Sequence, residues 1–91
     1  MNVECHLFGP FREDVGRKRL ERDPDGETVG ELLAELEREF PVLEGRLLEG
    51  GGLAGETVVT KNGRDVRHVD GLETALEDGD LYRLVPSVYG G

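Results

Sequence analysis

The hydrophobic positions in the first quarter of the chain form short segments separated by strong breakers. In NVECHLF (residues 2–8) apolar and charged side chains alternate, which is the period of a half-buried strand. Gly9 and Pro10 end this strand, and FREDVG (11–16) is expected to be a loop. The charged segment RKRLER (17–22) is predicted to return as an antiparallel edge strand. A turn is indicated after it by Asp-Pro-Asp-Gly (23–26).

The strongest helical pattern is TVGELLAELEREFP, residues 28–41. Thr28 is a good N-cap and Glu31 follows three residues later, so the two form a capping box, and Pro41 stops the helix. One apolar stripe at helical spacing is formed by Val29, Leu32, Leu33, Leu36 and Phe40. The charged residues that are expected to face water are Glu31, Glu35, Glu37, Arg38 and Glu39.

The second half of the chain predicts two further strands. A glycine-rich loop (45–55) precedes the strand ETVVTK (56–61), which ends at an Asn62-Gly63 turn. After short turns, LYRLVP (81–86) forms the last strand. The predicted fold is therefore α+β, with one main helix packed on a mixed sheet of about four strands. We expect one domain over residues 1–91 with a flexible tail at 87–91. The predicted core comprises Val3, Cys5, Leu7, Leu32, Leu33, Leu36, Tyr82 and Leu84.

Composition narrows the classes of function. The 91 residues carry a formal charge of -9, which makes nucleic acid a poor partner. No apolar run is long enough to span a bilayer, and no secretory leader is evident. A single cysteine fits a reducing compartment. We therefore expect a cytoplasmic protein without membrane contact. Only two of the eleven basic residues are lysines. An acidic, lysine-poor surface suits either a very salty cytoplasm or electrostatic steering toward a basic partner enzyme.

Two features resemble chemical sites but favour plainer interpretations. Residues 50–55 contain a literal G-x-G-x-x-G, yet a dinucleotide site needs a strand before it and a helix after it, so a flexible loop is favoured. Cys5 and His6 are adjacent in a strand and point to opposite faces, so they cannot form a nucleophile–base pair. One cysteine and two scattered histidines give no metal-ligand spacing. No catalytic apparatus, cofactor site or metal site is predicted.

Four segments resemble the ubiquitin-like sulfur-carrier family, which includes the small subunit of molybdopterin synthase, the thiazole sulfur carrier and the small archaeal modifier proteins. LFGPFREDVG (7–16) resembles the first strand of the family and the loop that follows it. ETVGELLAELEREFP (27–41) resembles the start of the family's helix. VVTKNGRDV (58–66) is similar to a strand and Asn-Gly turn, and LEDGDLYRLVPSVYGG (76–91) to the closing segment with its Gly-Gly ending. These matches run in order over nearly the whole chain.

The resemblance implies a β-grasp fold and a defined chemistry at Gly91. A ubiquitin-activating-type enzyme would use ATP to adenylate the Gly91 carboxylate, so the chain would be a carrier or substrate and no enzyme. The acyl-adenylate could then accept sulfur as a thiocarboxylate or pass to a lysine amine as an isopeptide bond. Gly90 and Gly91 have no Cβ and can lie fully extended in a narrow channel.

The sequence is compatible with three functions. The favoured one is a modifier of the small archaeal type, conjugated through Gly91 to lysines of target proteins and also able to carry sulfur. The alternative is a dedicated sulfur carrier, the small subunit of molybdopterin synthase, whose partner would be the large subunit. The third is a ubiquitin-like binding module that docks without covalent chemistry. In each case a monomer is expected when the protein is free.

The partner-facing surface is expected on the solvent side of the sheet, which leads into the tail. Its predicted residues are Phe8, Leu81, Arg83, Val85, Val88 and Tyr89. Alternatively, Phe8 merely covers the loop at Phe11. Self-linked chains could form only on Lys18, Lys61 or the N-terminal amine. Lys61 is expected to be well exposed beside its turn and Lys18 to lie on the edge strand, but both lysines could instead be solvated surface charges.

Overall fold

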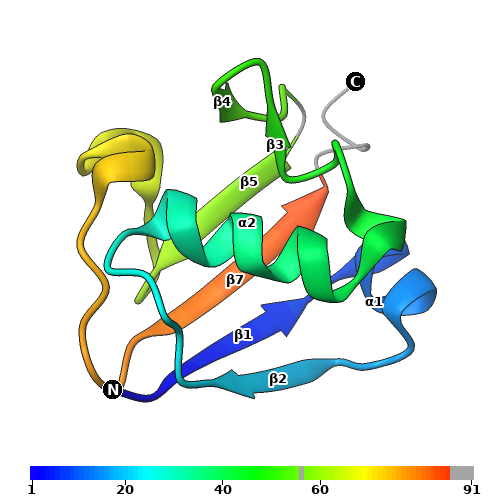
Figure 1. Cartoon of the computed structure of the whole chain (residues 1–91), viewed down its shortest axis with the longest axis horizontal. Helices are drawn as coiled ribbons and strands as arrows, with labels where there is room; N and C mark the ends of the chain where they lie inside the picture. Colours follow the sequence, from blue (N-terminus) through cyan, green and yellow to red (C-terminus); the bar gives the residue numbers. More distant parts are fainter. Residues whose placement is uncertain (56, 87–91) are drawn as a thin grey trace.

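The computed structural model describes residues 1–55 and 57–86, which form a five-stranded mixed sheet with helix α2 (Val29–Glu39) across one face (Figure 1). The strand order is β2-β1-β7-β5-β6. The central pair β1–β7 is parallel, and the other neighbours are antiparallel. The strands are β1 (Val3–Leu7), β2 (Arg19–Arg22), β5 (Thr57–Lys61), β6 (Arg64–Asp65) and β7 (Leu81–Pro86). The predicted edge strand is confirmed as β2, and β6 adds a short strand to the expected four.

Helix α2 begins and ends where the sequence predicts. The Thr28 side chain accepts a hydrogen bond of 3.2 Å from the Glu31 N–H, and Phe40 is the C-cap. The Glu31 carboxylate reaches back to the N–H of Glu27 at 2.8 Å and to the Thr28 hydroxyl at 3.3 Å. Both ends of the capping box thus satisfy donors at the helix start that have no partner within the helix.

The core lies between α2 and the face of the sheet that α2 covers. All eight residues predicted to be buried are buried, and Leu36 is 1% exposed. Tyr82 is the largest fully buried side chain. Because alternate residues of β7 are buried and half-buried, the strand presents one face to the core and the other to the solvent side, as the sequence pattern predicts.

The segment expected to be a loop after the first strand is a short helix, α1 (Gly9–Val15). Pro10 breaks the strand but also suits the first turn of a helix, where its missing N–H needs no partner. Phe11 is buried and anchors the helix to the core, with the Arg46 guanidinium 5.1 Å from its ring centre. Gly16, at φ 82°, ends the helix by donating its N–H to the Arg12 carbonyl.

The glycine-rich loop also contains unexpected order. Within it, β3 (Leu48–Glu49) and β4 (Gly52–Leu53) pair as a hairpin beside the end of β7 (Figure 1). Gly50 and Gly51 both have positive φ, at 60° and 84°, which a two-residue type I′ turn requires. The remaining described elements are three 3-10 helices at Pro41–Leu43, Val66–His68 and Gly71–Glu73.

Two carboxylates of α2 that were expected only to face water instead hold loops. Glu37 accepts the backbone N–H groups of Gly45, Leu47 and Leu48 at 2.9 to 3.1 Å, which fixes the approach to β3. The Glu35 carboxylate likewise accepts hydrogen bonds from the backbone N–H groups of Asp25 and Gly26. The helix therefore positions chain segments through its polar side as well as through its apolar stripe.

Candidate functional site

The candidate site is the outer face of the sheet, which is the face turned away from α2. It lies near the C-terminal end of β7. β7 occupies the middle of the sheet and ends at Pro86, immediately before residues 87–91. Leu81, Arg83 and Val85 are half-buried on this face. Phe8 is 38% exposed and donates its backbone N–H to the Leu84 carbonyl at 3.2 Å, which holds it beside the end of β7.

The strand register sorts this face into rows that cross the sheet. Nearest the end of β7 lies an apolar row, in which Val85 is paired with Val58 and stands beside Phe8. The next row is basic, because His6 is paired with Arg19 on one side and Arg83 on the other. We call these the apolar row and the basic row.

The third row carries the opposite charge. Glu4 pairs with Glu21 across β2 and with Leu81 across β7. The Glu4 carboxylate also lies 2.7 Å from His6 Nε2 and so links the acidic end of the face to the basic row. The outer face is therefore polarised along β7, with apolar and basic side chains near the end of the strand and carboxylates farthest from it.

The basic row borders a concavity of about 480 Å³. Its lining is His6, Phe8, Lys18, Arg19 and Arg83. This basic concavity contrasts with the formal charge of -9 of the whole chain, and its chemistry is complementary to an apolar side chain close to acidic groups. Of the residues predicted for this surface, Phe8, Leu81, Arg83 and Val85 lie on the outer face. His6, Lys18 and Arg19 were not among the predicted residues, because their position beside the concavity depends on the β1–β2 register.

Phe8, which was expected either to face a partner or to cover the loop at Phe11, lies in different surroundings from Phe11. Phe11 is buried in α1 and covered by the core, while Phe8 lines the concavity on the other side of the sheet. Cys5 and His6 do point to opposite faces. Burial raises the pKa of the Cys5 thiol to about 12, so the thiol is held away from the outer face and in its neutral form.

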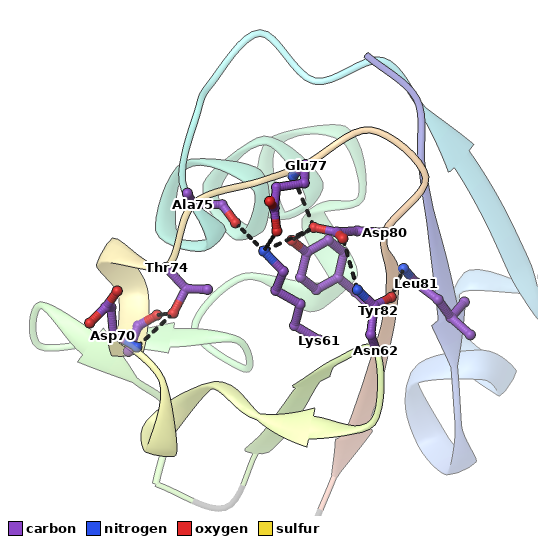
Figure 2. Close-up of polar contacts among 10 residues, drawn as sticks. Lys61, Asn62, Asp70, Thr74, Ala75, Glu77, Asp80, Leu81 and Tyr82 are labelled. Atoms are coloured by element: carbon purple, nitrogen blue, oxygen red, sulfur yellow. Dashed lines mark hydrogen bonds and ion pairs between the residues drawn. The ribbon is translucent and has the colours of Figure 1, made fainter.

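Lys61 is not well exposed, contrary to the sequence-based expectation. Its side chain is 14% exposed and its ammonium donates to the Ala75 carbonyl at 2.7 Å and to Glu77 at 2.6 Å (Figure 2). Asp80 lies 3.3 Å away. Desolvation lowers the pKa of Lys61, but the bonds and charges of Glu77 and Asp80 outweigh it and raise the pKa above its usual value. Lys18, by contrast, is exposed and lies one residue before β2.

Asp80 is the centre of a polar network that fixes the start of β7, and the sequence did not reveal it (Figure 2). The Asp80 carboxylate accepts hydrogen bonds from the Tyr82 hydroxyl at 2.6 Å, Asn62 Nδ2 at 2.9 Å and the Glu77 N–H at 2.9 Å. Asn62, at φ 49°, also accepts the Leu81 N–H at 2.8 Å. The Asn62-Gly63 turn and the EDGD turn are thereby joined at the entry to the strand that carries the tail.

The predicted chemistry at the C-terminus falls outside the described residues. Gly90, Gly91, Val88 and Tyr89 all belong to the segment that follows Pro86. Within residues 1–55 and 57–86, no group of His, Cys, Asp or Glu side chains is placed to hold a metal ion. The helices in the same part of the chain are too short or too polar to span a bilayer.

A helix laid across a mixed sheet with a parallel central pair and flanking hairpins defines the ubiquitin-like β-grasp class, which confirms the fold expected from the resemblance. The chain belongs to the ThiS family, whose model matches residues 5–91. The match includes both terminal glycines and nearly all of the described structure.

Named relatives cover the chain completely. Small archaeal modifier protein 3 of Haloferax volcanii is 47% identical over the full length of both proteins. The sulfur carrier protein CysO of Mycobacterium tuberculosis is 35% identical, also over both full lengths. These relatives are small modifier and sulfur-carrier proteins, which is the general class to which the sequence was assigned.

Solved structures agree with this class. The solution structure of the Haloferax volcanii HVO 2177 protein has a TM-score of 0.86 at 46% identity, covering 100% of this chain and 87% of that one. CysO in the Amycolatopsis orientalis BexX/CysO complex has a TM-score of 0.80 at 29% identity, covering 98% of this chain and 99% of that one.

Proposed function

We propose that the chain is a ubiquitin-like modifier that is joined through its Gly91 carboxylate to lysine amines of target proteins, and that it also carries sulfur as a Gly91 thiocarboxylate. The observation that carries the proposal is the full-length match, at 47% identity, to a protein named as a modifier. The family match through residue 91 supports it further, because it includes Gly90 and Gly91.

The chemistry at Gly91 is an acyl transfer in two steps. A carboxylate oxygen of Gly91 attacks the α-phosphate of ATP on an adenylating enzyme, forming the acyl-adenylate and releasing pyrophosphate. A lysine amine then attacks the acyl carbon, forming the isopeptide bond and releasing AMP. If hydrosulfide attacks the acyl carbon at the second step instead, a C–S bond forms, AMP is released and Gly91 carries the thiocarboxylate. The chain contributes the carboxylate and a tail end without Cβ atoms, which suits a narrow channel.

The outer face is proposed to dock the adenylating enzyme. The apolar row lies closest to the tail, and Phe8 gives it an exposed aromatic anchor of the kind that dominates binding energy. The basic row beside it favours an enzyme surface with acidic side chains, and Arg83 can bind such a carboxylate through two N–H groups. Val88 and Tyr89 would extend this contact toward the active centre of the adenylating enzyme.

A second candidate function is a dedicated sulfur carrier, with the large subunit of molybdopterin synthase as its partner. It is favoured by the 35% match to CysO, which is named as a sulfur carrier. The two functions share the adenylation step and differ only in the acceptor. They are distinguished by the product, since a dedicated carrier forms the thiocarboxylate and leaves no modified lysines.

The adenylation step can be tested with the adenylating enzyme of the same organism in an ATP–pyrophosphate exchange assay. Deleting Gly90-Gly91 should abolish exchange. Phe8→Ala and Arg83→Ala should each raise KM about tenfold, since an anchor at a docking interface typically contributes more than about 1 kcal/mol. Arg38→Ala is the matched control, because Arg38 is exposed on α2, on the opposite side of the sheet. Normal activation of both outer-face variants would place the docking surface elsewhere.

A further inference from the structure

Lys18 lies at the border of the proposed docking face. Its backbone carbonyl accepts the Leu7 N–H at 2.9 Å, which fixes the residue beside the end of β1 that leads to Phe8. Its side chain lines the concavity together with Phe8 and Arg83. It is exposed, and among the described residues it forms no ion pair. The amine is therefore accessible on the surface from which β7 continues into the tail.

The other two amines of the chain are placed differently. Lys61 donates to one carbonyl and one carboxylate, has a second carboxylate 3.3 Å away, and is only 14% exposed. The N-terminal amine lies 3.3 Å from Asp23, at the end of β1 remote from Phe8 (Figure 1). Lys18 is thus the one side-chain amine in residues 1–55 and 57–86 that is both accessible and without a carboxylate partner.

We propose that Lys18 accepts the Gly91 acyl group of a second copy, and that this linkage prevents the acceptor copy from being activated at its own Gly91. The inference rests on the proposed function, because it requires adenylation at Gly91 and docking through the outer face. Lys18 Nζ attacks the Gly91 acyl carbon of the second copy's acyl-adenylate. The C–N bond forms, the C–O bond to AMP breaks, and the proton of the amine passes to water.

The linkage blocks the face for steric and electrostatic reasons. A second domain with a radius of gyration of 11.8 Å would be tied to the border of a concavity of about 480 Å³. Even fully extended, the five residues beyond Pro86 reach at most about 18 Å, so the added domain stays over or beside the outer face. Amide formation also removes the Lys18 charge and weakens the basic concavity.

Self-linkage at Lys18 would limit how much of the protein can be conjugated to other proteins. In a free self-linked pair, only the acceptor copy has an unused Gly91 carboxylate, and its docking face is the one that is covered. Such pairs cannot be activated for transfer to other proteins. Self-linkage therefore withdraws the modifier from use until the isopeptide bond is cleaved.

The blocking step is tested by attaching a bulky group at this position. Lys18→Cys and the control Arg38→Cys each lose one positive charge, and each is coupled to a maleimide polyethylene glycol similar in mass to the domain. Cys5 does not interfere, since it is fully buried and burial raises its pKa to about 12. We expect coupling to lower kcat/KM for ATP–pyrophosphate exchange at least about tenfold for Lys18→Cys, relative to the same variant uncoupled, and to change Arg38→Cys less than about twofold.

The acceptor step is tested by mass spectrometry of a mixture that holds only the modifier, its adenylating enzyme and ATP. Chymotrypsin cleaves after Tyr89, so a modified lysine keeps a Gly-Gly remnant, which we expect on Lys18. Lys18→Arg should remove the self-linked species and Lys61→Arg should retain it, because arginine keeps the charge but accepts no acyl group. Adenylation without a remnant on Lys18, or equal activation of coupled and uncoupled Lys18→Cys, would overturn the inference while leaving the proposed function standing. Failure of the unmodified protein to be adenylated would overturn both.

Discussion

Replacing Asp80 by alanine should remove a large part of the stability of the domain. Asp80 is 4% exposed, and its carboxylate accepts three hydrogen bonds, from the Tyr82 hydroxyl, Asn62 Nδ2 and the Glu77 N–H. The Lys61 ammonium lies 3.3 Å away. Asp80→Ala leaves a buried phenol hydroxyl and a side-chain amide without an acceptor, and it removes one partner of a half-buried ion pair.

The magnitude follows from these losses. A buried donor left unsatisfied costs about 1–3 kcal/mol, and three donors lose the Asp80 carboxylate. Loss of the ion pair adds less, because Lys61 keeps the Glu77 carboxylate and the Ala75 carbonyl as partners. Because the groups share one carboxylate the losses are not additive, and we expect a total of about 3–5 kcal/mol. A domain of this kind is stable by about 5–15 kcal/mol. The substitution should therefore remove at least about a fifth of the free energy of unfolding.

Urea unfolding followed by circular dichroism measures this change. Asp78→Ala is the matched control, since Asp78 is an exposed carboxylate of the same turn, and within residues 1–55 and 57–86 it accepts only the Asn2 N–H, at 2.7 Å. We expect the urea midpoint of Asp80→Ala to fall strongly and that of Asp78→Ala to change by the equivalent of less than about 1 kcal/mol, with similar m values. Equal midpoints for the two variants would refute the assigned role of the network.

The same carboxylate predicts a dependence on pH. Desolvation raises the pKa of Asp80, but hydrogen bonds from Tyr82, Asn62 and the Glu77 N–H, with Lys61 added, outweigh it and lower the pKa overall. Because folding lowers the pKa of Asp80, its ionised carboxylate stabilises the folded state fully at any pH above the pKa of an unfolded aspartate, near 3.9. This stabilisation is lost as the pH falls from that value through the lower pKa of the folded state. The stability difference between the wild type and Asp80→Asn should be constant above about pH 5 and shrink below about pH 4.

Three further predictions concern the scaffold. Leu36→Ala should lower the free energy of unfolding by about 2–5 kcal/mol, because Leu36 is fully buried on the face of α2 that packs against the sheet, and a loss below about 1 kcal/mol would contradict its place in the core. Thr28→Ala should lose about 1 kcal/mol in the same assay, while Thr28→Ser should restore most of it. Cys5 should react with a thiol reagent only after unfolding, so rapid labelling of the native protein would show that the thiol is not held inside the sheet.

The main elements were predictable because each has its own local pattern. The stripe and capping box of α2 lie within fourteen consecutive residues, 28–41, and the alternation in β1 and β7 separates buried from outer residues without any knowledge of pairing. Helix α1 was missed because it is only seven residues long and opens with Gly9-Pro10, two breakers that here also begin a helix. The β3–β4 hairpin was missed because glycines leave no side-chain pattern.

The details of the site depended on long-range pairing. Lys61 looks exposed when only its Asn62-Gly63 neighbours are considered, yet the β5–β7 register sets it opposite Tyr82 and brings it close to Asp80. The basic row arises because β2 and β7 place Arg19 and Arg83 on either side of His6. No local signal in the sequence specifies such pairings, because each joins residues that are far apart in the chain.

The central claim, that Gly91 is joined to lysines of other proteins, is tested most directly by mass spectrometry of proteins recovered from cells with an N-terminally tagged copy. Digestion with chymotrypsin should reveal lysines that carry a Gly-Gly remnant, cleaved after Tyr89. We predict that these remnants are present with the intact tail and absent when Gly90-Gly91 is deleted, although the truncated domain is equally stable, since the two glycines bury no side chain. A thiocarboxylate at Gly91 with no modified lysines in the intact protein would contradict the modifier function and favour the dedicated sulfur carrier.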